Sequence, residues 1–141
     1  KNFEPGTDVV MAKTPFGNIG LMVCYDLRFP ELALTLRSQG ANILTAPAAF
    51  THTTGEMHWQ LLLQARAMDS QCQVLGSAQQ GWHGEKRQTW GHAGATNSRG
   101  QILQITDQEG TQLLTVPFDL AEQEAIRASM PLMQHRKIIS F

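Results

Sequence analysis

Residues 19–23 form a short apolar segment that leads directly into Cys24, and this feature constrains the fold more than any other part of the sequence. Pro30 and the leucines after it predict a helix that is closed by Gly40, and residues 42–46 form the next apolar segment. A strand, a helix and a strand in this order make the crossover unit of a sheet with parallel neighbours. The sequence therefore predicts an α/β fold with Cys24 at the carboxyl edge of its sheet.

Other apolar segments and turn signals complete the predicted order of elements. Two apolar runs separated by Thr14-Pro15-Phe16-Gly17-Asn18 indicate a hairpin ahead of the crossover. A long helix is predicted over 56–73, packed on the sheet through apolar residues at helical spacing, namely Met57, Leu61, Leu62, Ala65, Met68 and Cys72. We expect later strands at 74–78, 91–96, 101–106 and 112–118, a surface loop over 80–90, and a final helix from an Asp119 cap to about Met130, followed by a basic tail at 135–137.

Composition narrows the range of partners. The chain has 141 residues, of which 42% are hydrophobic and 16% charged, and this balance fits one globular domain. Lysine and arginine number 11 against 12 aspartate and glutamate, without a basic run, so we expect no nucleic-acid partner. No stretch approaches the ~20 apolar residues that cross a bilayer, and residues 1–5 lack the apolar region of a signal peptide. We expect no membrane partner and a cytoplasmic location.

The cysteines and histidines give no metal motif. Cys24 and Cys72 form no C-x-x-C pair, so neither a zinc site nor a disulfide framework is indicated. His52, Glu56 and His58 lie close in sequence, but their spacing fits no familiar zinc motif. We expect no metal and no cofactor.

Cys24 is the candidate nucleophile. A free cysteine is among the most buried residues in proteins, so packing alone would explain an isolated one. The polar cluster directly after this strand, 25–28, favours a functional site, because charged groups at such a point need water, each other or a ligand. A hydrolase that pairs Cys24 with His83 or His92 is an alternative from the same residues.

Several segments, in order along the chain, resemble one known family. The first is Gly20-Leu21-Met22-Val23-Cys24-Tyr25-Asp26-Leu27-Arg28-Phe29-Pro30-Glu31. Others are 40–44, 47–51, 54–59, 63–69, 91–93, 97–100 and Arg127 near Met130-Pro131. Together they resemble the nitrilase, or carbon–nitrogen hydrolase, superfamily, and in particular its Nit branch of small amidases. The resemblance covers nearly the whole chain.

The resemblance implies a fold and a reaction. The family folds as an α-β-β-α sandwich that dimerises through helices, often into larger assemblies, so we expect a homodimer or a higher homo-oligomer. Its members hydrolyse an amide or nitrile through a thioester intermediate. Cys24 would then be the nucleophile, and the backbone N–H of Tyr25 would help to stabilise the oxyanion.

The resemblance also implies a class of substrate. Arg28, Phe50 and Thr54 match positions that line the pocket in Nit-type amidases, where the arginine can hold a carboxylate. The expected substrate is a small carboxylate-bearing amide, such as deaminated glutathione or an α-keto acid amide. The structural alternative for Arg28 is an ion pair with Asp26 or Glu31.

The family's other catalytic residues are not matched. Its general-base glutamate, its oxyanion lysine and a second glutamate all precede the cysteine. Aligning Pro5-Gly6 with the family's Pro-Gly shows that Glu4 is not one of them. We therefore expect residues 1–141 to be the C-terminal part of a single carbon–nitrogen hydrolase domain, with an incomplete sandwich and weak turnover alone. The alternative is a non-catalytic remnant or a dimerising pseudoenzyme.

Overall fold

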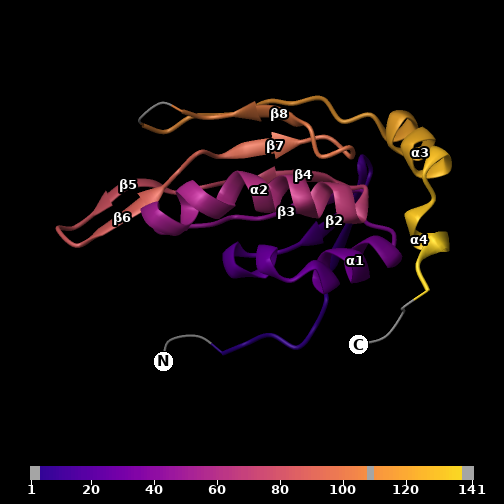
Figure 1. Ribbon diagram of the computed structural model, residues 1–141, viewed down its shortest axis with the longest axis horizontal. Coiled ribbons are helices and arrows are strands. Elements are labelled where there is room, and N and C mark those ends of the chain that lie inside the picture. Colours follow the sequence, from indigo (N-terminus) through magenta and orange to yellow (C-terminus); the bar gives the residue numbers. More distant parts are fainter. Residues whose placement is uncertain (1–3, 108–109, 138–141) are drawn as a thin grey trace.

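The computed structural model describes residues 4–107 and 110–137, and a single mixed sheet dominates them (Figure 1). Its strand order is β1-β2-β3-β4-β7-β8, and a separate hairpin pairs β5 with β6. The strands are β1 (Met11–Thr14), β2 (Gly17–Leu21), β3 (Ile43–Thr45), β4 (Gln73–Gly76), β5 (Gln80–His83), β6 (Arg87–Trp90), β7 (Gly94–Thr96) and β8 (Ile102–Ile105). The helices are the 3₁₀ helix η1 (Cys24–Arg28), α1 (Pro30–Ser38), α2 (His52–Ser70), α3 (Leu120–Ser129) and α4 (Leu132–His135).

The predicted crossover forms the centre of the sheet. Strands β2, β3 and β4 are parallel neighbours, with α1 and α2 as the connections between them. On the outer side of β2, the antiparallel pairing with β1 confirms the predicted hairpin, although β1 begins two residues later than the apolar run suggested. Thr14 Oγ1 donates to the carbonyl of Gly17 at 2.6 Å and closes the turn, and Gly17 has a φ of +138° there.

Helices α1 and α2 cover one face of the sheet (Figure 1). Gly76 on β4 lets α2 approach closely, because a Cβ there would lie 2.7 Å from the Trp59 ring. The core between the two layers is apolar and fully enclosed, and its largest members are Met22, Leu27, Leu36, Leu44, Trp59, Leu63 and Val74. This packing is the main source of hydrophobic stabilisation in the domain.

The predicted packing face of α2 is correct in part, since Cys72 belongs to the core and Leu62 packs against it, but it is wrong for three of its six residues. Met57, Leu61 and Met68 are 58%, 65% and 52% exposed. The buried row is instead Gly55, Trp59, Leu63 and Ala67, with Arg66 and Ser70 beside it. These four residues recur at intervals of four, so they lie along one ridge of the helix, where glycine and alanine allow close approach to the sheet. The apolar stripe Met57, Leu61 and Met68 faces outward.

The second half of the chain departs from the prediction in two places. Residues 80–90 form the hairpin of β5 and β6 rather than a loop, because Gly84 at a φ of +69° supplies the turn. Residues 112–118 are extended but pair with no strand. They cross the other face of the sheet, where the Gln73 side chain donates to the carbonyl of Pro117 at 3.0 Å.

The C-terminal helices close one end of the sheet. Asp119 caps α3 as predicted, since its carboxylate accepts from the N–H of Glu122 at 3.0 Å. Arg127 docks this helix by donating to the carbonyls of Ala41 and Gln71, at 2.9 and 3.2 Å. The short helix α4 occupies part of the region predicted as a basic tail. In the described ranges, no helix combines the length and the apolar character needed to cross a membrane.

Candidate active site

Cys24 lies on a sharp turn between a strand and a helix. Strand β2 ends at Leu21, and η1 begins at Cys24 itself, whose φ is +47°. A non-glycine residue in this left-handed region is strained by ~1–3 kcal/mol and needs support from its surroundings. The N–H of Cys24 donates to the carbonyl of Pro47 at 2.9 Å, and the carboxylate of Asp26 accepts from the N–H of Val23 at 2.8 Å. These two bonds hold the strained turn.

A cavity of about 410 Å³ opens at the carboxyl edge of the parallel strands and includes Cys24. The segments after β3 and β4 form its other walls and are tied together by two hydrogen bonds. The N–H of Ala48 donates to the carbonyl of Ser77 at 2.8 Å, and the N–H of Gln79 donates to the carbonyl of Ala48 at 2.9 Å. The lining residues are Val23, Cys24, Pro47, Ala48, Ala49, Ser77, Ala78 and Gln79. The cysteine therefore lies at the sheet edge that the crossover predicted.

The backbone N–H of Tyr25 is available beside the thiol. Within the described part of the chain, no backbone or side-chain group accepts a hydrogen bond from it. An unpaired N–H next to a sulfur nucleophile is an arrangement that can stabilise an oxyanion. The sequence-based role of Tyr25 stays a prediction that this geometry allows.

No acid or base lines the Cys24 cavity. Its lining contains no histidine, lysine or carboxylate among the described residues. His83 Nε2 instead contacts Thr89 Oγ1 at 2.8 Å, and His92 Nδ1 donates to the carbonyl of Trp90 at 2.9 Å while its ring stacks on Trp90. The alternative pairing of Cys24 with one of these two histidines is therefore not formed. Among the described residues, the lining of this cavity offers Cys24 no acid–base partner.

Arg28 and Phe50 are brought together, whereas Thr54 stands apart from Cys24. The Arg28 guanidinium lies 5.1 Å from the centre of the Phe50 ring and 5.5 Å from that of Tyr25. Thr54 Oγ1 shares a hydrogen bond of 2.8 Å with Thr51 Oγ1 at the start of α2. None of the three predicted substrate-binding residues lines the Cys24 cavity itself, but Phe50 directly follows its wall.

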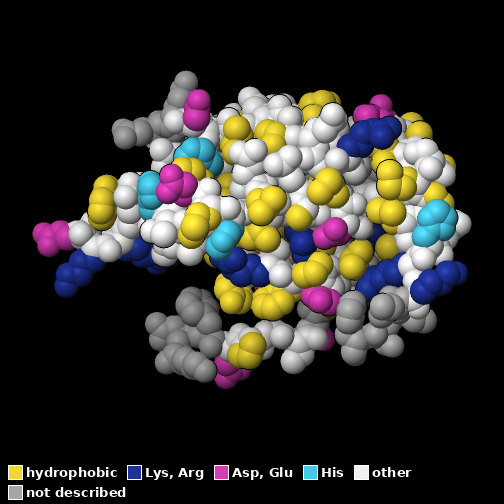
Figure 2. Space-filling model, in the orientation of Figure 1, with side chains coloured by type: hydrophobic (Ala, Val, Ile, Leu, Met, Phe, Trp, Pro, Cys, Tyr) yellow, Lys and Arg dark blue, Asp and Glu magenta, His cyan; other side chains and the backbone are white. Residues whose placement is uncertain are grey.

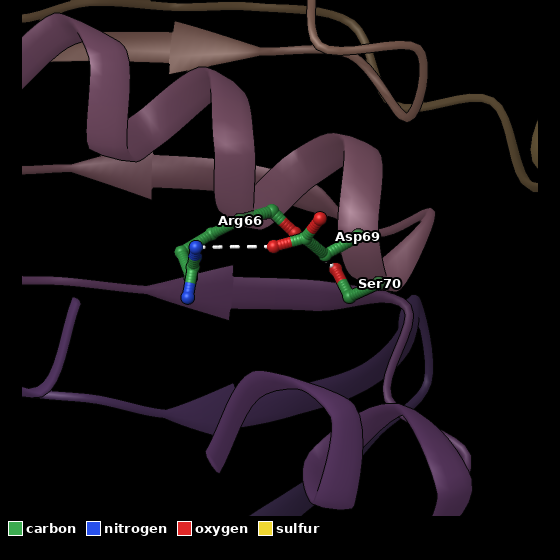
Figure 3. Close-up of polar contacts among 3 residues, drawn as sticks. All are labelled: Arg66, Asp69 and Ser70. Carbon is green, nitrogen blue, oxygen red and sulfur yellow. Dashed lines mark hydrogen bonds and ion pairs between the residues drawn. The ribbon is translucent and has the colours of Figure 1, made fainter. Parts of the chain in front are cut away.

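The alternative for Arg28, an ion pair with Asp26 or Glu31, is not formed among the described residues. Arg28 Nη1 lies 3.3 Å from His58 Nδ1 on α2 instead. Arg66 and Asp69 on α2 form an ion pair, with Nη2 and Oδ2 3.0 Å apart (Figure 3). The sequence analysis missed the contact between Arg28 and His58, because thirty residues separate them and no local pattern signals it.

The described residues contain no group of three or more histidine, cysteine, aspartate or glutamate side chains that could hold a metal ion. His58, which lies in the segment considered for such a site, contacts Arg28. Phe50 packs edge-to-face on Trp59, with ring centres 5.2 Å apart. The candidate site therefore consists of the Cys24 thiol, the half-buried guanidinium of Arg28 and the aromatic rings around it.

The two cysteines should differ sharply in reactivity. Cys72 is fully buried, and burial raises the pKa of its thiol, while a hydrogen bond to Ser70 and the charge of Arg127 oppose that rise. A raised pKa means less thiolate at any given pH, so Cys72 should resist alkylation until the protein unfolds. Cys24 is half-buried and lines an open cavity. Iodoacetamide near pH 8 should therefore label Cys24 first, as read by peptide mass spectrometry.

Denatured protein is the control for this experiment, because both cysteines should then react at similar rates. Rapid labelling of Cys72 in the folded protein would contradict the burial of its side chain.

Comparison with known proteins shows a similarity to the carbon–nitrogen hydrolase family. The family model described as "Carbon-nitrogen hydrolase" matches residues 1–128. The chain is 45% identical over 138 residues to the deaminated glutathione amidase of Yersinia enterocolitica, in a match that covers 98% of this chain and 48% of that protein. It thus spans about half the length of the curated relatives it matches.

Solved structures agree with this similarity. Saccharomyces cerevisiae Nit3, a member of branch 10 of the nitrilase superfamily, matches with a TM-score of 0.87 and 32% identity, over 96% of this chain and 49% of that one. A mutant of the amidase from Nesterenkonia sp. AN1, with the acetamide moiety of fluoroacetamide on its active-site cysteine, matches with a TM-score of 0.67 and 25% identity, over 74% of this chain and 39% of that one. The predicted nitrilase-type fold is confirmed, and the described residues form one α layer and one β layer of it.

Proposed function

Because the chain belongs to the carbon–nitrogen hydrolase family, we propose that it carries the nucleophile of an amidase, with Cys24 in that role. One observation supports this most strongly. Cys24 occupies a strained turn, held by two hydrogen bonds, at the cavity where the parallel strands end. Strain of this kind persists where the surrounding structure fixes it, and it clusters at active sites.

The proposed reaction proceeds in two steps. The Cys24 sulfur, as thiolate, attacks the amide carbonyl carbon, and the oxyanion that forms accepts a hydrogen bond from the N–H of Tyr25. The carbon–nitrogen bond then breaks, and the nitrogen leaves as ammonia with the proton that the base took from the thiol. Water next attacks the thioester and releases the carboxylic acid and the free thiol.

The proposed base comes from outside the described cavity. In the family, a glutamate removes the thiol proton and a lysine assists the oxyanion, and both precede the cysteine. The lining of the Cys24 cavity supplies neither group among the described residues. The thiolate is the nucleophilic form of cysteine, and a neighbouring base or cation is what favours it. Turnover by residues 1–141 alone should therefore be very slow.

The proposed substrate is a small amide that bears a carboxylate, such as deaminated glutathione or an α-keto acid amide. The relative from Yersinia enterocolitica carries the first of these in its name. The Arg28 guanidinium supports the proposal, because it is half-buried near the cavity wall and pairs with no carboxylate of the described residues. We propose Phe50 and Thr54 as further substrate contacts.

A chimera tests the function. This chain replaces the segment of the Yersinia enterocolitica amidase that it matches, so that the remaining half of the relative supplies the missing acid–base groups. We expect the chimera to release ammonia from a carboxylate-bearing amide. A folded chimera that releases no ammonia from any such amide would instead support the non-catalytic alternative.

A homodimer through the helical layer is part of the proposal. Figure 2 shows hydrophobic side chains on the face formed by this layer, and the stripe Met57, Leu61 and Met68 on α2 contributes to the exposed apolar surface. Apolar stripes of this kind mark interfaces between proteins.

Leu61→Glu should weaken the dimer by at least about tenfold in Kd, because it places a carboxylate in the apolar stripe. Sedimentation velocity over a concentration series measures the effect. Gln60→Glu is the matched control, since it adds the same charge to an exposed neighbour on the same helix. Equal behaviour of the two variants would contradict an interface at this stripe.

A further inference from the structure

Arg28 is fixed at three points by residues from three elements. Its guanidinium carbon lies over the rings of Tyr25 on η1 and Phe50 after β3. Its Nη1 lies 3.3 Å from Nδ1 of His58, on the second turn of α2. A long arginine side chain loses considerable rotamer entropy when it is fixed in this way, so the contacts must favour one orientation.

The chemistry of the contact determines which ring nitrogen of His58 accepts the hydrogen bond. All five N–H groups of a guanidinium are donors, and none of its nitrogens accepts. His58 Nδ1 must therefore be unprotonated and accept the bond, which leaves the proton of the neutral ring on Nε2. The contact holds the charge of Arg28 without neutralising it, because a neutral imidazole carries no negative charge.

The rest of the guanidinium is unoccupied. Across residues 4–107 and 110–137, no carboxylate pairs with Arg28, and His58 is the only hydrogen-bond partner of its side chain. An arginine whose guanidinium packs on aromatic rings and has one N–H group held still presents other N–H groups that can bind a carboxylate in a bidentate way. The Arg28 guanidinium is therefore a preorganised binding site for an anion, and we call it the carboxylate seat.

This seat is close to Cys24 along the chain. Arg28 is on the same 3₁₀ helix as Cys24, four residues further along. Both aromatic contacts of the guanidinium come from residues that directly follow the cavity wall, Tyr25 after Cys24 and Phe50 after Ala49. A molecule with an amide at the thiol and a carboxylate a few bonds away could therefore engage both.

We propose that His58 is a positioning residue that holds the Arg28 guanidinium for the carboxylate of the substrate. This inference rests on the proposed function and deepens it, because it names a residue that sets the preference for acidic amides. His58 would act through Arg28 and would not touch the reacting atoms. Simple helix packing is a weaker account of His58, because its ring is only half-buried and its neighbour Trp59 fills the core.

The first experiment reads the hydrogen bond directly in the full chain. Nitrogen-15 spectra of the histidine rings report which ring nitrogen carries the proton. We expect His58 to show an unprotonated, hydrogen-bonded Nδ1 and a protonated Nε2, and to lose that signature in Arg28→Leu. A protonated Nδ1 in the wild-type chain would overturn the proposal, whatever the chain hydrolyses.

The second experiment measures carboxylate binding and needs no turnover. The probe is 2-oxoglutarate, the acid that an amide of a short dicarboxylic keto acid would release, and its uncharged dimethyl ester is the matched probe. Replacing His58 with leucine should weaken 2-oxoglutarate binding about tenfold by calorimetry, since a hydrogen bond to a charged group is lost. The ester should bind to wild type and variant alike.

A rescue variant distinguishes a positioning role of His58 from a role in folding of the chain. The amide oxygen of asparagine lies near the place of Nδ1, so His58→Asn should restore binding to within about twofold of wild type. Equal binding by the wild type and His58→Leu, or loss of ester binding together with 2-oxoglutarate binding, would overturn the proposal. So would a wild-type chain that does not prefer 2-oxoglutarate to the ester.

The outcomes distinguish this inference from the proposed function. A chimera that hydrolyses amides while His58→Leu binds 2-oxoglutarate normally would refute the role of His58 and leave the amidase intact. An inactive chimera with the expected binding pattern would refute the amidase and leave the carboxylate seat intact.

Discussion

Replacing Cys24 with alanine in the chimera should abolish amide hydrolysis, with a fall in kcat of roughly 10⁴-fold or more. The thiol supplies the atom that bonds to the carbonyl carbon, and no other described side chain of the Cys24 cavity is a thiol or an ionised nucleophile. Serine at this position should also be nearly inactive, because a hydroxyl is a much weaker nucleophile without a matched base. Ammonia release under saturating amide measures both variants.

Cys72→Ala is the control for this loss. This variant removes the other thiol, which is buried against Ala41 and Arg127 and does not line the Cys24 cavity. The Cys72→Ala chimera should therefore keep most of its kcat. A Cys24→Ala chimera that hydrolyses amides at the rate of the Cys72→Ala chimera would contradict the assignment of the nucleophile.

Replacing Trp59 with alanine should cost about 3–5 kcal/mol of unfolding free energy. The ring is 1% exposed, packs edge-to-face on Phe50 and covers Gly76, whose lack of a side chain makes room for it. Its Nε1 also donates to the carbonyl of His92 at 2.6 Å, so the variant leaves both a cavity and an unpaired acceptor. Urea denaturation measures the loss, which is a large share of the ~5–15 kcal/mol that stabilises a typical domain.

Two further variants serve as comparisons for the loss of stability in Trp59→Ala. Trp59→Phe keeps much of the ring and loses the donor, so it should cost about 1–3 kcal/mol. Trp82→Ala removes a tryptophan that is 65% exposed on the hairpin of β5 and β6, and its cost should stay within about 0.5 kcal/mol. A loss at Trp59 as small as that at Trp82 would contradict the packing of α2 on the sheet.

The central crossover could be predicted because its signals are local. The strand β2, the helix α1 and the strand β3 each have their own apolar run, proline or glycine, and the placement of Cys24 follows from their order. The same reasoning correctly predicted the Asp119 cap, which involves a backbone group three residues away.

The errors arose where tertiary contacts decide the outcome. On α2, apolar residues occupy both the buried ridge and the outer stripe, so hydrophobic periodicity alone could not say which face meets the sheet. Residues 112–118 have the composition of a strand but find no partner strand, and pairing depends on what lies beside them.

The candidate site, too, could be predicted from the sequence only in part. The sequence predicted that Cys24 lies at the sheet edge, and the family resemblance selected Arg28 and Phe50, which the structure brings into contact. The contact of Arg28 with His58 joins two helices through a single hydrogen bond, and no spacing rule connects such distant residues. Only the folded chain reveals it.

Mass spectrometry of the acyl-enzyme tests the central claim, that Cys24 is the nucleophile of an amidase, most directly. The chimera is mixed with an excess of a carboxylate-bearing amide, quenched rapidly in acid and digested. We expect an acyl group in thioester linkage on the peptide that contains Cys24, removable by hydroxylamine and absent from the Cys24→Ala chimera. An acyl group on a different residue, or amide hydrolysis that continues unchanged without Cys24, would contradict this role.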